Sequence, residues 1–459
     1  MEDSVSSISA EGLVFTICLG ILLLVLPRRY ALAPLLFAGS YMTLGQYLVI
    51  GGYHFHIIRM LIAFGFIRIL IRREFTDIEF NSIDFLFVSW LVISSLLYVL
   101  LSGDTALFNL RLGRVYNGLG IYFLVRASVR DLDDIVHLIK IFAAITIPLA
   151  VPFFIEYASG RNPFFILGGV PEFSQVRDGR PRCQGPFLHP ILVGTFAATA
   201  VPLFVGLWAH SSRYRLIALG SILTATFIVI VSSSSGPVLA YLGIVVGFSC
   251  WIAHEHMRKI RWGIVILLVA LHLIMKSPVW YLISRVSEIV GGSGWYRSAL
   301  IDAFFTHFDE WWLIGTSNTA HWMPTGISVS STMTDIVNHY VAQGVNGGLL
   351  SLVLFIWMIV RCFKAIGDAA HNEEYYAVPE RFMIWSLGCG LLGHVVSFFS
   401  VSYFDQINIF WYLNVGMAAA LATSQDQVVE NEISDPAPPY EKGYLSGTTD
   451  LPPISQTPV

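Results

Sequence analysis

The chain has 459 residues, of which 55% are hydrophobic, 14% aromatic and only 13% charged. Soluble domains carry about 25% charged residues, so this composition excludes an ordinary soluble enzyme and indicates a polytopic membrane protein. The formal net charge of −4 gives no support for a nucleic-acid partner. We expect membrane lipids, and molecules carried on lipids, as partners.

Apolar runs recur along most of the chain. The hydrocarbon core of a bilayer is about 30 Å thick, and a helix needs about 20 apolar residues to cross it. The runs therefore predict an all-α fold with about 12–14 transmembrane helices. We place spans near residues 11–27, 30–51, 55–71, 82–102, 107–126, 134–155, 187–209, 214–232, 235–253, 261–275, 343–366, 382–402 and 406–424. The segment before the first run lacks the basic flank of a cleavable signal peptide, so this run is expected to remain as a span.

Arginine and lysine occupy alternate short loops, as Arg28-Arg29 and Arg72-Arg73 illustrate, whereas the loop at 402–405 contains neither residue. Cytoplasmic loops retain basic residues, so this alternation predicts an outside N-terminus, an inside C-terminus and an odd number of spans. The two long loops are then extracytoplasmic, at about residues 156–186 and 276–334.

The predicted membrane domain covers residues 1–424. Residues 425–459 are polar and rich in proline, serine and acidic residues, which is typical of a disordered tail, here on the cytoplasmic side. The five cysteines show neither a metal-binding spacing nor a disulfide framework. No metal site and no cofactor is predicted, because the two H-x-H pairs lack carboxylate or cysteine companions.

The second long loop is the longest polar stretch of the chain. Between Tyr296 and Ile314, apolar residues recur at helical spacing, and Arg297 lies largely on the opposite side. This pattern predicts a helix lying in the membrane interface, with Trp311 and Trp312 at headgroup depth.

The end of this loop predicts the start of the next helix. Thr334 or Asp335 is expected to cap that helix and to place His339 in its first turn. Asp335 and His339, four residues apart, would then share a helix face.

Several arginines could bind a phosphate-containing ligand, because guanidinium groups stay charged and grip phosphate oxygens with two parallel hydrogen bonds. An alternative is that Arg111 and Arg114 snorkel or pair with a carboxylate such as Asp104, and that the loop arginines contact headgroups. The candidates are Arg111 and Arg114 near one end of a span, Arg180 and Arg182 in the first long loop, and Arg297 in the second.

His339 is the candidate general base, because imidazole is the side chain best matched to neutral pH. Asp335 could orient its ring, and Asn338 or Gln343 could bind a sugar hydroxyl. The alternative for His339 is a capping or packing role. Glycines that follow permit close helix approach; they are Gly344, Gly347 and Gly348.

Three stretches of the chain together resemble one protein family. The run Arg182-x-x-Gly185-Pro186-Phe187-x-His189-Pro190 looks like the R-x-x-G-x-F-x-x-P stretch of bacterial O-antigen ligases and O-antigen polymerases. The runs Tyr296-Arg297-Ser298-Ala299-Leu300 and Trp311-Trp312-Leu313-Ile314-Gly315 are similar to that family's outer helix and following turn. The run Asn338-His339-Tyr340-Val341-x-x-x-Val345-x-Gly347-Gly348 looks like its H-N-x-x-L-x-x-x-x-G-x-x-G stretch, with the first two residues in reverse order.

The resemblance implies an inverting, metal-independent glycosyltransferase with a C-type, all-helical membrane fold. It would take a glycan from an undecaprenyl-pyrophosphate donor at the outer face of the bacterial inner membrane and add it to a glycan or lipid acceptor, in surface-polysaccharide biosynthesis. His339 would accept the proton of the acceptor hydroxyl. Arg182 and Arg297, helped by Arg111 or Arg114, would stabilise the departing lipid pyrophosphate.

Two other classes stay open. A transporter or flippase of lipid-linked sugars would use the arginines as headgroup contacts, and we would expect internal repeats and charges near mid-membrane in both halves. A non-catalytic scaffold would leave the arginine and histidine motifs without a role. Within the leading class, a ligase and a polymerase differ only in the acceptor.

Overall fold

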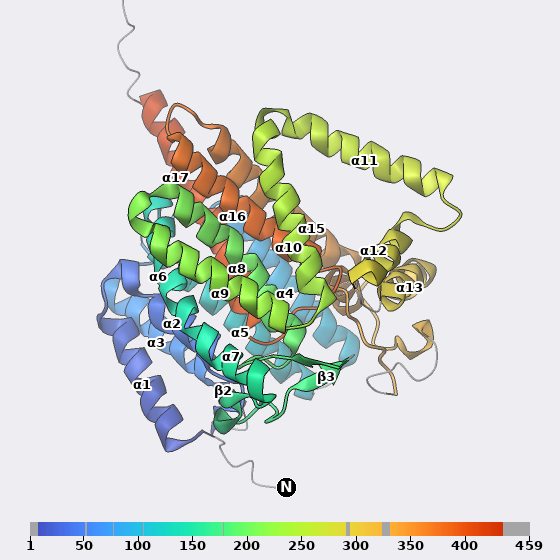
Figure 1. Cartoon of the computed structure of the whole chain (residues 1–459), viewed down its shortest axis with the longest axis horizontal. Helices are drawn as coiled ribbons and strands as arrows, with labels where there is room; N and C mark the ends of the chain where they lie inside the picture. The colour runs from blue at the N-terminus through green and yellow to red at the C-terminus, as the bar shows by residue number, and fades with distance from the viewer. Residues whose placement is uncertain are drawn as a thin grey trace, which may run out of the picture.

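The computed structural model describes residues 8–50, 53–76, 78–103, 105–177, 179–290, 294–323 and 331–434. This part of the chain is almost wholly helical, with two short hairpins (Figure 1). Seven of its helical segments are long and apolar enough to cross a membrane. They are Ser82–Ser102, Leu132–Ser159, Pro190–His210, Ser212–Val231, Ser235–Ile274, His339–His371 and Ile407–Gln427. The described residues therefore confirm the predicted class, an all-α polytopic membrane protein. The predicted number of about 12–14 transmembrane helices stays a prediction, since seven of the described helical segments meet this length and hydropathy.

The helices follow the predicted apolar runs with a few exceptions. In the first half they are α1 (Ala10–Val25), α2 (Ala33–Tyr41), α3 (Ile57–Arg72), α4 (Ser82–Ser102), α5 (Thr105–Ser128), α6 (Leu132–Thr146), α7 (Ala150–Ser159), α8 (Pro190–His210) and α9 (Arg215–Val231). In the second half they are α10 (Ser235–Ser249), α11 (Met257–Ile274), α12 (Leu282–Val290), α13 (Gly294–Thr306), α14 (Phe308–Trp311), α15 (His339–His371), α16 (Val378–Ser397) and α17 (Ile407–Ser434).

The helix predicted at 30–51 is wrong in its second half. Helix α2 ends at Tyr41, and a hairpin of β1 (Tyr47–Ile50) and β2 (Tyr53–His56) follows. The reason is a long-range contact, because Thr43 and Gln46 both donate hydrogen bonds to the carbonyl oxygen of Leu167 in the first long loop. These two hydrogen bonds hold the backbone after Tyr41 against the first long loop, so the helix does not continue.

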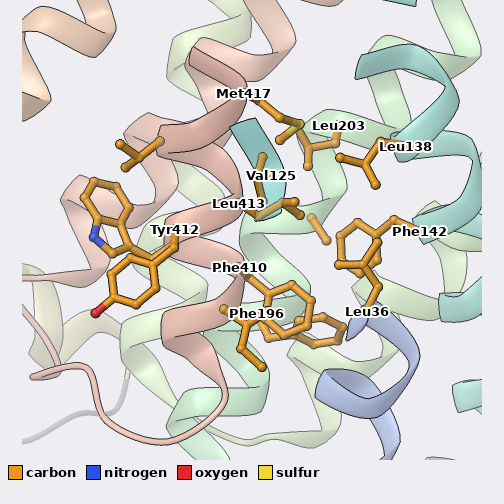
Figure 2. Packing of buried hydrophobic residues seen from close by; sticks show 14 of the residues in the cluster. Leu36, Val125, Leu138, Phe142, Phe196, Leu203, Phe410, Tyr412, Leu413 and Met417 are labelled. Atoms are coloured by element: carbon orange, nitrogen blue, oxygen red, sulfur yellow. The ribbon is translucent and has the colours of Figure 1, made fainter. Parts of the chain in front are cut away.

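Helices α8 and α17 form the centre of the molecule. Figure 2 shows Phe410 of α17 beside Phe196 of α8 and Phe142 of α6, and Met417 of α17 beside Leu203 of α8. Small residues along α8 let its neighbours approach closely, which is how helices gain packing energy in a lipid environment. They include Gly194, Ala197, Ala198, Ala200 and Gly206, and each alanine in this set is almost fully buried.

Ion pairs on buried carboxylates join several basic loops at one end of the helices. Asp134 accepts a hydrogen bond from Arg28 (2.7 Å) and lies within ion-pair distance of Arg29 (3.0 Å). Arg126 binds Asp84 at 2.8 Å, with both side chains almost fully buried. These contacts bring together loops that the alternation of basic residues predicts to lie on the same side.

Helix α11 diverges from the helical body, and none of its residues is buried (Figure 1). A 3-10 segment, η5 (Cys250–His256), separates it from α10, with a break at Ala253. At the other end of the chain, α17 continues to Ser434, so the predicted tail is helical at its start. Its remainder, 435–459, lies outside the described residues.

Candidate functional site

The first long loop carries Arg177, Arg180 and Arg182 on a hairpin of β3 (Gln175–Arg177) and β4 (Arg180–Arg182). Glu156, at the end of α7, is fully buried and fixes the base of this hairpin. Its carboxylate accepts hydrogen bonds from the Ser174 hydroxyl (2.9 Å) and from the backbone N–H groups of Gln184 (3.0 Å) and Gly185 (2.9 Å). The position of Arg182 is therefore set by a buried carboxylate.

Arg182 reaches the serine-rich turn between α9 and α10. Its Nη2 donates to the Ser234 hydroxyl across 2.9 Å. Its Nε is buried without a hydrogen-bond partner, and no carboxylate of the described residues lies within ion-pair distance of this guanidinium. Burial, and secondly the positive charge of Arg177, lowers the pKa of Arg182.

Arg297 reaches the same turn from α13. Its Nη1 lies 3.5 Å from the Ser235 hydroxyl, and its Nε donates to the carbonyl oxygen of Ser400 across 3.3 Å. Burial, and again the charge of Arg177, lowers the pKa of Arg297. The prediction that Arg297 lies on the polar side of an interfacial helix is wrong, because its side chain is 7% exposed and points into the protein.

The interfacial helix predicted from Tyr296 to Ile314 is two helices, with a break at His307. Trp311 is buried and stacks on Phe304, with ring centroids 3.8 Å apart, whereas Trp312 is 45% exposed. The apolar face thus packs largely on protein, against residues of α15 and of the segment before it.

The serine turn itself has an unusual backbone. Ser233 has a φ of 45°, in the left-handed region, and its hydroxyl donates to the carbonyl oxygen of Pro181 in β4. Ser234 is the N-cap of α10, but its side chain caps no N–H group. Instead it donates to the carbonyl of Ser232 and accepts from Arg182. Arg182 and Arg297 thus meet at a helix N-terminus, which itself carries partial positive charge.

His339 is the first residue of α15. The cap is Asn338, whose side-chain oxygen accepts from the N–H groups of Tyr340 and Val341. The predicted cap at Thr334 or Asp335 is therefore wrong, and Asp335 precedes the helix and shares no helix face with His339. The Asn338 carboxamide lies immediately before the helix, so it accepts from the free N–H groups of the first turn in place of Thr334 or Asp335.

Both ring nitrogens of His339 have neighbours. Its Nδ1 accepts from the backbone N–H of Tyr403 across 3.0 Å, and its Nε2 lies 3.1 Å from the amide nitrogen of Gln343. A backbone N–H can only donate, so Nδ1 is the acceptor in this contact and a neutral ring would carry its proton on Nε2. The Gln343 amide nitrogen is also a donor, so its contact with Nε2 is not a hydrogen bond in that tautomer. To accept a further proton at Nδ1, His339 must release Tyr403.

Arg111 and Arg114 lie on the α15 side of the site. Arg111 donates to Asn346 across 2.7 Å and covers the ring of Tyr98. Arg114 lies 5.7 Å from the centroid of the Trp90 ring. The Trp90 indole donates to Gln343, which contacts His339. The alternative partner Asp104 lies outside the described residues.

The segment between α16 and α17 joins the arginine and histidine contacts. Arg297 binds the carbonyl of Ser400, and His339 binds the N–H of Tyr403. The serine turn touches the same segment, since a Cβ added to Gly236 would lie 2.9 Å from the Cβ of Ser400. The structure therefore links Arg182, Arg297 and His339 through two touching segments.

Two other predicted residues take a smaller part in these contacts. Arg180 lies on β4, opposite Arg177, and is exposed. Asp335 contributes its backbone oxygen, which accepts from the Tyr296 hydroxyl across 2.7 Å. Burial raises the pKa of the Asp335 carboxyl.

Two residues that the sequence analysis did not select lie beside these contacts. His189, the N-cap of α8, accepts from the N–H of Ile191 through Nδ1. Burial, and secondly the charge of Arg182, lowers the pKa of His189 to about 4, so it is a neutral N–H donor at pH 7. Asp405 has a φ of 63°, accepts from the N–H of Leu188 and leaves its buried Oδ1 without a partner. His189 belongs to the motif that contains Arg182, whereas no sequence pattern pointed to Asp405.

Together these groups form a cationic site with hydroxyl and N–H donors at a helix N-terminus, which can bind a polyvalent anion. Comparison with known proteins adds no relative, because no family model and no curated protein matches the chain. The geometry and charge of Arg182, Arg297 and His339 are therefore what indicate a function.

Proposed function

We propose that the protein transfers a glycan from a lipid-linked pyrophosphate donor to an acceptor hydroxyl, the activity that the motif resemblance implies. The observation that carries this proposal is the meeting of Arg182 and Arg297 on consecutive serines at the start of α10. Burial, and secondly the positive charge of Arg177, lowers the pKa of both guanidinium groups, and the buried Nε of Arg182 has no hydrogen-bond partner. A pyrophosphate would offset this positive charge and could supply an acceptor for that Nε.

The leaving group explains why the charge is useful. As the bond between the anomeric carbon and the pyrophosphate oxygen breaks, negative charge develops on that oxygen. Positioned guanidinium donors stabilise this charge, and removal of one comparable donor typically costs about 10²–10³ in kcat. The charge of Arg177 and the partial charge of the α10 N-terminus act in the same direction.

The acceptor side completes the proposed reaction. The acceptor oxygen forms a bond to the anomeric carbon from the face opposite the pyrophosphate, which inverts the configuration. Its proton goes to Nδ1 of His339, and the lipid pyrophosphate leaves. This step requires the segment around Tyr403 to move, because its N–H occupies Nδ1 in the present state. Gln343, which contacts the ring, and Asn338, whose side-chain oxygen caps α15, are the two amides that we assign to hydroxyl recognition.

The proposal includes the biological setting. We propose an undecaprenyl-pyrophosphate donor, a site on the outer face of the bacterial inner membrane and a product that enters a surface polysaccharide. The acceptor, a lipid or a second lipid-linked glycan, separates a ligase from a polymerase.

The test is glycan transfer by purified protein in lipid nanodiscs, with a lipid-pyrophosphate-linked oligosaccharide as donor and candidate acceptors supplied in turn. Arg182→Ala and Arg297→Ala are expected to lower kcat by about 10²–10³. The matched control is Arg285→Ala, which removes an exposed arginine from the second long loop and should leave the rate unchanged.

Two results would contradict this function. Variants of Arg182 and Arg297 that react as fast as the wild type would remove the arginines from the chemistry. Donor movement across vesicles without any product would instead favour a transporter of lipid-linked sugars.

A further inference from the structure

A second cluster lies apart from the site that Arg182 and Arg297 form at the start of α10, which we call the arginine site. It consists of His307, Glu310 and His321. Each offers one ligand atom, and the three atoms lie within 4.8 Å of one another. His307 stands at the break between α13 and α14, Glu310 lies in α14, and His321 lies in the 3-10 segment η7 (Ala320–Trp322). Nδ1 of His307 lies 2.8 Å and Nε2 of His321 lies 2.9 Å from the same oxygen, Oε1 of Glu310.

The donor set is one that transition metals use. Two imidazoles and one carboxylate, with a fourth position left to water, are typical of three-ligand zinc sites. Bonds of about 2.0–2.1 Å to a tetrahedral ion place neighbouring ligand atoms about 3.3 Å apart. The two distances to Glu310, 2.8 and 2.9 Å, lie close to this separation, and the two histidine nitrogens lie within 4.8 Å of each other.

Neighbouring groups orient these ligands. The Trp322 indole donates to Oε2 of Glu310 across 2.9 Å, which leaves Oε1 directed at the two histidines. The rings of Trp322 and His307 lie almost parallel, with 6° between their planes. Hydrogen bonds and packing behind the ligands are what hold metal-binding side chains in place in proteins. The ligands themselves are between 28% and 47% exposed, so an ion can enter from solvent.

The cluster joins two parts of the second long loop that are distant in the chain. Trp322 is 6% exposed and packs with Phe304 and Trp311 in the small core above α15. Ala320 donates to the carbonyl of Thr332, so the η7 segment is also joined to the strand of chain that leads to α15. An ion at the cluster would fasten this segment to the end of α13.

We propose that His307, Glu310 and His321 bind one divalent transition-metal ion, best matched by Zn²⁺, which holds η7 against the α13–α14 turn. The ion joins η7 to the α13–α14 turn and takes no part in the transfer chemistry proposed above. The inference is therefore independent of that proposal, and its test does not measure transfer.

The test uses the full-length protein in detergent, stripped with a chelator, desalted and then titrated with Zn²⁺ alone. Competition with a chromophoric zinc indicator gives affinity, and elemental analysis after desalting gives stoichiometry. The wild type is expected to bind one ion per chain. Trp322→Phe, which removes the hydrogen bond to Glu310, should weaken binding about 10–100-fold, and His321→Asn or Glu310→Gln should weaken it further.

The matched control is His256→Asn, which removes an exposed histidine from η5 and should bind zinc as the wild type does. Thermal unfolding without metal establishes that each variant is folded. Added Zn²⁺ should raise the Tm of the wild type and of the control but not that of His321→Asn. If a variant does not fold, the d–d spectrum of Co²⁺ bound to the wild type reports the ligands instead.

Three outcomes would overturn the proposal. The first is a wild type that binds no more zinc than the His307→Asn/Glu310→Gln/His321→Asn variant. The second is unchanged affinity in the two single ligand variants. The third is a Co²⁺ spectrum of an ion coordinated by water alone.

Discussion

The backbone N–H of Leu349 donates to the carbonyl of Trp312 across 2.8 Å, which joins the turn after α14 to a break in α15. A second bond, from Thr316 N–H to the carbonyl of Val345, lies beside it. The break consists of Gly347 and Gly348, and Gly348 has a φ of 67°. The turn after α14, in the second long loop, and the glycine pair inside α15 therefore form one joint.

This joint makes Gly348 sensitive to substitution. A Cβ at this position would lie 2.4 Å from the carbonyl oxygen of Leu313, and the left-handed backbone disfavours any side chain. We expect Gly348→Ala to lower the free energy of unfolding by about 1–3 kcal/mol or more and to lower the Tm. The control is Gly367→Ala in the same helix, where an added Cβ would meet nothing within 4 Å. This variant should raise the free energy of unfolding by about 0.5–1 kcal/mol. Equal Tm values for the two variants would show that α14 does not need the break.

Glu156 is expected to hold the β3–β4 hairpin, which carries Arg182, in place. Its carboxylate accepts three hydrogen bonds in a fully buried position, so Glu156→Ala leaves three donors without a partner. Each buried donor left unsatisfied costs about 1–3 kcal/mol, which is enough to open the hairpin locally. Hydrogen exchange of the amides of Gln184 and Gly185 should become faster by at least tenfold.

The control for Glu156 is Glu172→Gln, which breaks the partly exposed ion pair with Arg161 in the same loop. Such pairs contribute about 0–1 kcal/mol, so exchange at the two amides should change little. Unchanged exchange in Glu156→Ala would mean that other contacts hold the hairpin.

The Asp405 carboxyl should make stability depend on pH. Burial raises its pKa to about 7, against the opposing effect of hydrogen bonds from the N–H groups of Leu188 and Gln406. The folded state then retains a proton that the unfolded state releases between about pH 4 and pH 7. The stability that this group contributes is therefore complete below about pH 4 and is lost as the pH rises to about 7.

Asparagine at position 405 cannot ionise and tolerates the left-handed backbone. The Asp405→Asn variant should therefore not lose stability as the pH rises. We expect the variant to gain Tm relative to the wild type at pH 8 and to gain little at pH 5, with a difference on the order of a few kcal/mol in unfolding free energy. Asp368→Asn, which removes an exposed carboxylate from α15, should show no such change between the two pH values. A Tm difference for Asp405→Asn that is the same at both pH values would contradict the prediction.

The sequence predicts the membrane helices well where local composition alone decides them. The apolar run at 82–102 coincides with α4, and the runs at 187–209 and 214–232 lie close to α8 and α9. The run at 30–51 fails because a contact with Leu167, distant in the chain, ends α2 early. Hydropathy carries no information about such a contact.

The same limit applies to the candidate site. The cost of placing charge in a membrane protein identifies Arg182 and Arg297 as unusual, but not the serine turn that they meet. Arg297 was expected on the polar face of its helix, because amphipathic spacing does not reveal that Ser400 lies behind it. Asp405 is prominent only through its backbone conformation and burial, which no local motif encodes.

Lysine substitutions can separate the charge of Arg182 and Arg297 from the geometry of their guanidinium groups. Lysine keeps the positive charge but lacks the planar fork that grips two phosphate oxygens. If Arg182 and Arg297 hold one pyrophosphate, Arg182→Lys and Arg297→Lys should each lower kcat/KM for the lipid-linked donor by about tenfold or more. Arg285→Lys is the control for an exposed arginine and should react as the wild type does.

The double variant Arg182→Lys/Arg297→Lys tests whether the two side chains act as a unit. Residues that stabilise the same developing charge are non-additive, so the double variant should lose less than the product of the two single losses. The measurement is a double-mutant cycle of kcat/KM at fixed ionic strength. Strict additivity would mean that the two arginines serve different ligands, although Arg182 contacts Ser234 and Arg297 contacts the adjacent Ser235.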